Sequence, residues 1–162
     1  MNLFEPASHR KSISWQLGVF VVWTAVTGIG RFLHADPAGH GTHQELGLPP
    51  CPAALFLNRP CPGCGLTTSW TALLHGQWAF AFHAHPLGPV LYLLFTCAAM
   101  LSVYGFARGL RLNIDGPGMN RFLGTCAVIF IAFGLTRMAL TTDYRSDVEK
   151  MYAQEMGIAK AP

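Results

Sequence analysis

Charged residues are scarce in this sequence of 162 residues. Lys, Arg, Asp and Glu make up 12% of it, whereas soluble globular proteins carry roughly 25%. Residues 12–30 and 60–107 contain none of the four, and 51% of all residues are apolar. So few charges cannot cover the surface of a soluble domain of this size, and the apolar content excludes a disordered chain. The composition therefore predicts a small all-α membrane protein in which residues 1–162 form a single membrane domain.

Several motifs that carry enzymatic or nucleic-acid chemistry are also missing. The sequence has no P-loop, no G-x-G-x-x-G after a strand, no H-E-x-x-H and no nucleophile elbow. It has no basic stripe for a nucleic acid, so we expect no partner of that kind. The middle of each long apolar segment lacks a charged residue, which argues against a proton-coupled transporter or a charge-gated channel. These absences favour a protein that is not an enzyme, with the lipid bilayer as its main partner.

Three apolar segments predict membrane-spanning helices, because backbone polar groups in hydrocarbon must pair within the segment and a span needs about 20 residues. The segments are residues 13–32, 86–108 and 119–140. Pro86 can start the second helix, since its missing N–H would be unpaired at that position anyway. The uncharged part of the third segment is short, so it crosses the membrane only if Arg121 and Arg137 extend to the two interfaces.

Residues 66–83 have helical periodicity but a mixed character. Leu, Trp and Phe recur at helical spacing, while threonines and His75 occupy the other side. With tryptophans on the apolar side and a break at Gly76, the pattern predicts one or two short helices that lie in the membrane interface or re-enter it. A fourth span is the alternative interpretation, which the interrupting Thr, His and Gln residues disfavour.

The basic residues predict an orientation in the membrane. Arg10 and Lys11 precede the first span, and three arginines lie around the connection between the second and third. By the positive-inside rule, this distribution places the N-terminus in the cytoplasm and the His- and Cys-containing loop, residues 34–65, outside. The polar tail, residues 141–162, would then be external as well, although its own basic residues count against that placement.

Three of the five cysteines lie in the polar loop. Cys61 and Cys64 form a C-x-x-C motif, and Cys51 precedes it by ten residues. The two other cysteines fall within predicted spans, where a lone cysteine behaves as a small apolar residue. The chemistry of the chain is therefore expected at the loop cysteines.

The C-P-G-C-G run, which contains Gly63 and Gly65, predicts a tight turn. Gly65 accepts a positive φ at no steric cost, as the turn of a metal-binding knuckle requires. Such a turn supplies two thiolates, and Cys51 could add a third because a ten-residue loop closes at low entropic cost. The predicted ligand is zinc or another thiophilic metal held by the three loop cysteines. The candidates for a further ligand are His40, His43 and His85.

Two alternatives remain open for the C-x-x-C pair. A thiol–disulfide centre would use Cys61 as the attacking thiolate and Cys64 as the resolving thiol, with the following helix lowering a thiol pKa. A plain disulfide would brace the external loop, which an oxidising compartment favours. We therefore expect a non-catalytic membrane protein with a metal or disulfide staple. An accessory subunit that docks to other membrane proteins and a membrane thiol–disulfide oxidoreductase are the alternatives.

The cysteine motifs resemble a family of small bacterial membrane proteins. Cys51-Pro, then C-P-G-C-G-L-T at residues 61–67, then His85-Pro-Leu resemble a domain of unknown function with a pattern like C-P…C-P-G-C-G-x-T-R…G…N-P. Thr68 stands where that family usually has Arg, and His85 stands where it usually has Asn. The resemblance implies a bacterial inner-membrane location and supplies no activity. In that membrane, the positive-inside rule places the Cys/His loop in the periplasm.

Overall fold

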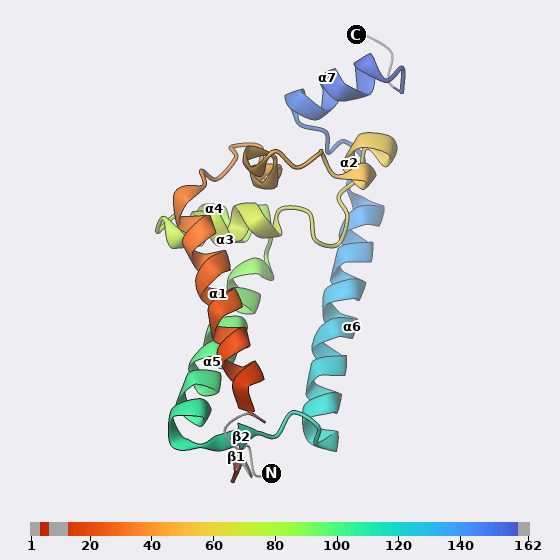
Figure 1. The fold of residues 1–162 in the computed structure, drawn as a ribbon. Helices are drawn as coiled ribbons and strands as arrows, with labels where there is room; N and C mark the ends of the chain where they lie inside the picture. The colour runs from red at the N-terminus through yellow and green to blue at the C-terminus, as the bar shows by residue number, and fades with distance from the viewer. Residues whose placement is uncertain (1–3, 7–12, 159–162) are drawn as a thin grey trace.

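The computed structural model describes residues 4–6 and 13–158. The long helices run along the molecule, and shorter elements lie at its two ends (Figure 1). The long helices are α1 (Ser14–Phe32), α5 (Gly88–Arg108) and α6 (Pro117–Leu140). At one end, β1 (Phe4–Pro6) pairs antiparallel with β2 (Leu110–Leu112). At the other lie the 3-10 helix η2 (Thr42–Leu46) and the helices α2 (Pro52–Leu57), α3 (Leu66–Leu74), α4 (Trp78–Ala84) and α7 (Asp147–Glu155).

Two helices of the described chain, α5 and α6, are long and apolar enough to cross a membrane. Of their most apolar stretches, 17% and 6% are buried inside the molecule, whereas the core helix of a soluble protein is mostly buried. α1 is nearly as long but carries Gln16 and Arg31 near its ends, which lower its apolar content. The mostly helical fold class is confirmed, and a membrane span for all three long helices stays a prediction.

The start of α5 differs from the sequence-based expectation. The helix begins at Gly88, with Leu87 as its N-cap, and the proline in its first turn is Pro89 rather than Pro86. The helix does have a proline in its first turn, as expected, but this proline is Pro89, three residues after Pro86. Pro86 lies in the turn between α4 and α5.

The segment 66–83 forms two short helices, α3 and α4, on either side of Gly76, whose φ is 75°. Helices of nine and seven residues cannot cross a bilayer that requires about 20, so the alternative of a fourth span is wrong. They lie across the ends of α1 and α5 (Figure 1) and pack on each other through Ala72, Leu73 and Ala81. Their placement in a membrane interface stays a prediction.

A buried glutamine joins α1 to α5 and β2. Nε2 of Gln16 donates to the carbonyls of Ser102 at 3.2 Å and Leu110 at 3.3 Å, and its Oε1 accepts from the N–H of Leu112 at 3.4 Å. Gly105 allows this approach, because a Cβ there would lie 2.6 Å from the Gln16 amide nitrogen. Gln16 therefore ties α1 to the end of the molecule that carries the β-ribbon.

The segment after α6 was expected as a polar tail and contains the helix α7. Its N-cap is Ser146, whose Oγ accepts from the N–H of Glu149 at 3.3 Å, while Oε2 of Glu149 accepts from the N–H of Ser146 at 2.9 Å. This reciprocal pair is a capping box, which satisfies two otherwise unpaired N–H groups. α7 lies beside α2, at the same end of the molecule as the cysteine loop (Figure 1).

We predict that Gln16→Ala lowers the free energy of unfolding by about 1–3 kcal/mol, because it leaves buried backbone groups of α5 and β2 without partners. Thermal unfolding in detergent micelles measures this loss. Thr24→Ala is the matched control in the same helix, since Thr24 bonds only the carbonyl of Phe20 in its own helix. Equal stability of the two variants would contradict the role given to Gln16.

Candidate metal centre

The three loop cysteines come together in one cluster. The sulfur atoms of Cys51, Cys61 and Cys64 all lie within 4.8 Å of one another, and those of Cys51 and Cys64 are 3.3 Å apart. Sulfurs bound at about 2.3 Å to one tetrahedral zinc are about 3.8 Å apart, so the observed spacing suits a shared ion. The three thiols are therefore close enough to hold one metal ion.

The turn that presents Cys61 and Cys64 depends on Gly65. Its φ is 86°, a left-handed conformation that favours glycine, as the C-P-G-C-G motif predicted. A Cβ at this position would meet the carbonyl oxygen of Ala84 well inside contact distance and would lie 2.9 Å from that of Gly39. The turn is thus packed directly against the backbone of the polar loop and of the end of α4.

Arg137, near the end of α6, fixes the same turn from the other side. Its guanidinium donates to the carbonyl of Cys64 at 2.7 Å and to that of Ala84 at 3.1 Å, and it also donates to the hydroxyl of Tyr144 at 3.3 Å. Gly134, one turn earlier, lets Pro62 of the C-x-x-C motif touch the helix backbone. The cysteine turn is therefore bound to α6 by both a charge and a close packing contact.

The thiols have unequal acidity. Burial raises the pKa of Cys64, and the neighbouring thiols of Cys61 and Cys51 raise it further. For Cys51, burial is outweighed by hydrogen bonds from the N–H groups at the start of α2, above all that of Ala54, so its pKa is lowered. Of these two thiols, Cys51 is thus the one that more readily becomes a thiolate.

A cavity of about 410 Å³ borders the cluster. All three cysteines contribute to its wall, together with polar groups from the loop, from α3 and from α7. The polar residues of the wall are His40, His43, Thr67, Thr68 and Glu149. The volume exceeds that of several water molecules, each of which takes about 30 Å³ in the liquid.

The first histidine candidate, His40, is occupied by other partners. Its Nδ1 lies 3.1 Å from the carbonyl oxygen of Ala38, and its Nε2 lies 2.9 Å from Oε2 of Glu149. The ring stacks on Tyr144 with the centroids 4.1 Å apart. Because both ring nitrogens are engaged, His40 serves as the docking point of the C-terminal segment.

The other two histidine candidates are also outside the sulfur group. His43 lies with its Nε2 3.2 Å from the carbonyl oxygen of Pro49. His85 is fully buried, with its Nε2 3.1 Å from the carbonyl oxygen of Pro62. Burial lowers the pKa of His85, and the charge of Arg137 lowers it further, so its ring is neutral and supports the cysteine turn. Within the described residues, no histidine or carboxylate joins the three sulfurs in a metal-sized group.

Glu149 is the buried acid of this region. Burial raises its pKa, but hydrogen bonds from His40 and from the N–H of Ser146 outweigh burial and hold the pKa below its ordinary value. Its side chain is 0% exposed, and its Oε1 has no hydrogen-bond partner within the described structure. The wall of the cavity therefore contains a charged carboxylate with one unpaired oxygen.

A comparison with protein families gives one match, to a Protein of unknown function (DUF2752). Residues 51–99 match this family. The match confirms the resemblance predicted from the cysteine motifs and covers the whole cysteine cluster, α3, α4 and about half of α5. No curated protein and no solved structure matches the chain.

Several residues of the site lie outside the segment that matches DUF2752, among them His40, Arg137 and Glu149. The sequence predicted His40 as one candidate ligand and Arg137 as an interfacial residue, and it predicted no role for Glu149. The Ser146-x-x-Glu149 pattern is a capping-box signature and would have placed Glu149 in the first turn of a helix. Nothing in the sequence indicates that this helix docks on His40.

We predict that Gly65→Ala disrupts the cluster, because the added Cβ forces the turn away from Ala84 and costs about 1–2 kcal/mol in backbone conformation alone. The change should appear as a lower unfolding temperature and as faster maleimide labelling of the buried Cys64. Gly63→Ala is the control in the same turn, since a Cβ there meets nothing within 4 Å. Identical labelling rates in the two variants would show that the contact does not shape the turn.

Proposed function

We propose that this chain is an integral membrane protein that binds zinc or another thiophilic metal through Cys51, Cys61 and Cys64 at one membrane surface. The observation that carries the proposal is the convergence of the three sulfur atoms within 4.8 Å. Soft thiolate ligands select zinc and copper(I) over hard cations. The bound metal would tie the start of α2 to the start of α3 and so fasten the loop onto the helices.

The arrangement of the long helices supports a membrane location. α5 and α6 expose most of their apolar surface, as helices in contact with lipid acyl chains would. The cysteine cluster lies where α1 and α6 end and α5 begins, so in a bilayer crossed by these helices it would lie at a surface. We place this surface on the periplasmic side of a bacterial inner membrane, with the N-terminus in the cytoplasm.

A second candidate function is thiol–disulfide exchange. The distance of 3.3 Å between the sulfurs of Cys51 and Cys64 and the lowered pKa of Cys51 favour it. In this function Cys51 would attack and Cys64 would resolve, which differs from the C-x-x-C pair expected from the sequence. The exchange would also need an external disulfide partner.

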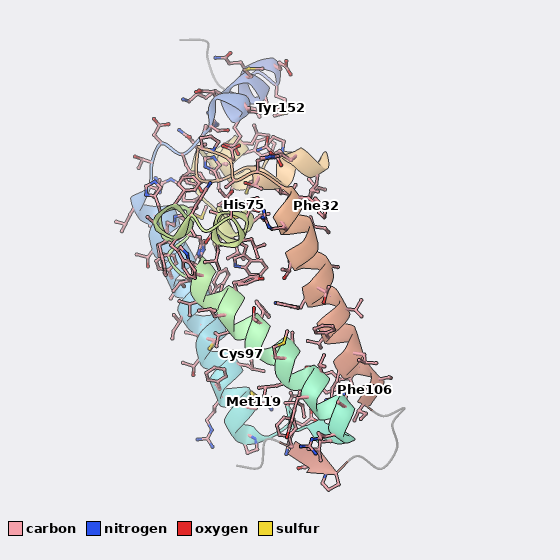
Figure 2. All side chains as sticks on the ribbon, turned by 90° about the vertical axis from the view of Figure 1, so that its left-hand side faces the viewer. Phe32, His75, Cys97, Phe106, Met119 and Tyr152 are labelled. Atoms are coloured by element: carbon pink, nitrogen blue, oxygen red, sulfur yellow. The ribbon has the colours of Figure 1, made fainter. Side chains whose placement is uncertain are left out.

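Metal analysis of the purified full chain tests the first function. We expect about one metal ion per chain in the parent protein and less than about one-tenth in the variant with Cys51, Cys61 and Cys64 replaced by Ser, because the ion would lose all its sulfur ligands. The control replaces Cys97 and Cys126, which lie within α5 and α6, by Ser (Figure 2 labels Cys97). This control should keep the full metal content.

A parent chain with three free thiols and no metal after zinc or copper(I) is supplied would contradict metal binding. A Cys51–Cys64 disulfide in the isolated protein, together with partner disulfides that accumulate in Cys64→Ser, would instead establish the exchange function.

A further inference from the structure

The proposed metal site is one ligand short. Zinc in proteins is almost always four-coordinate, and a site with three protein ligands keeps the fourth position for water or another small ligand. Among the described residues, only the three cysteines form a group of metal-binding atoms here. His40 is a buried histidine of the cavity wall. Its two ring nitrogens are already engaged by Ala38 and Glu149. The described structure therefore supplies three ligands in one group, and the fourth position is left to an outside ligand.

The cavity next to the sulfurs has room for that ligand. Its volume of about 410 Å³ lies against all three cysteines, so a metal held between the sulfurs would border it. The mixed wall of prolines, glycines and threonines leaves space for water molecules or a compact organic group. Among the described residues that line it, no Lys or Arg side chain would attract an anion.

One side chain in the cavity wall sets the charge that a ligand in the cavity meets. Oε2 of Glu149 accepts hydrogen bonds from Nε2 of His40 and from the N–H of Ser146, both at 2.9 Å. Its Oε1 has no hydrogen-bond partner among the described residues, although the side chain is fully buried. Buried acceptors are almost always paired with a protein group or an ordered water. The unpaired Oε1 therefore leaves Glu149 with a negative charge that its partners compensate only in part, next to the cavity.

We propose that the fourth coordination position opens into the cavity and holds an exchangeable water molecule, beside the negatively charged Glu149 in the cavity wall. Small neutral donors such as ammonia can replace this water, whereas the carboxylate repels small anions. This inference rests on the proposed metal binding. Under it, the site is not a closed structural site, because one position accepts a ligand from outside the chain.

X-ray absorption of the zinc-loaded full chain in detergent tests the coordination. We expect three sulfurs at about 2.3 Å and one oxygen at about 2.0–2.2 Å. Three sulfurs alone, four sulfurs, or a histidine nitrogen in the fourth position would overturn the inference while leaving metal binding intact. A chain that binds no zinc would overturn both.

Azide binding to the cobalt-loaded chain, followed by visible absorption, tests the role of Glu149. We expect Glu149→Gln to bind azide about tenfold more tightly than the parent, because the variant removes a negative charge beside the open position. Glu155→Gln removes an exposed carboxylate from the same helix and should match the parent. Cobalt content and circular dichroism of each variant verify folding. Equal azide affinity in a folded Glu149→Gln and the parent would refute the part assigned to Glu149.

Discussion

The backbone of Gly65 lies against the carbonyl oxygens of Gly39 and Ala84, and the positions of the three sulfurs depend on this contact. Gly39 belongs to the polar loop after α1, and Ala84 is the last residue of α4. The contact therefore fixes the C-x-x-C turn between two segments that are distant in the sequence. Any side chain at position 65 would separate them, and the cluster with Cys51 would open.

Arginines complete the assembly of this end of the molecule. Arg137 donates to the carbonyls of Cys64 and Ala84, and Arg59 donates to those of Met138 and Ala139 at the end of α6. Carbonyl groups at a helix C-terminus lack partners within the helix, so a cation there is stabilising. These arginines let a helix of apolar character end beside a polar site, because each charge is paired with backbone oxygens.

The C-terminal segment closes the site through contacts between distant residues. Oδ1 of Asn58, which ends α2, accepts from the N–H groups of Tyr144 and Arg145, and the guanidinium of Arg145 donates to the carbonyl of Leu55. Beyond these contacts Glu149 reaches His40. The cavity wall therefore includes residues of the loop after α1 and a residue of α7, the helix that follows α6.

The local features of this arrangement could be predicted from the sequence. The Cys spacing, the positive φ of Gly65 and the break at Gly76 follow from residue types and their order alone. The pairing of His40 with Glu149 joins residues 109 positions apart and could not be predicted, since it depends on where α6 delivers the chain. Arg137 was assigned to the interface for its charge, whereas its partners are set by the tertiary position of the cysteine turn.

Arsenite titration of the reduced chain with Cys97 and Cys126 replaced by Ser most directly tests whether the three sulfurs form one cluster. Trivalent arsenic binds three thiolates at once, so its capture reports their convergence whichever metal the protein prefers. We predict that intact mass spectrometry finds one arsenic per chain, with three thiol hydrogens lost and no thiol left to alkylate. An arsenic held by two sulfurs with the third alkylated, or no bound arsenic, would contradict the account.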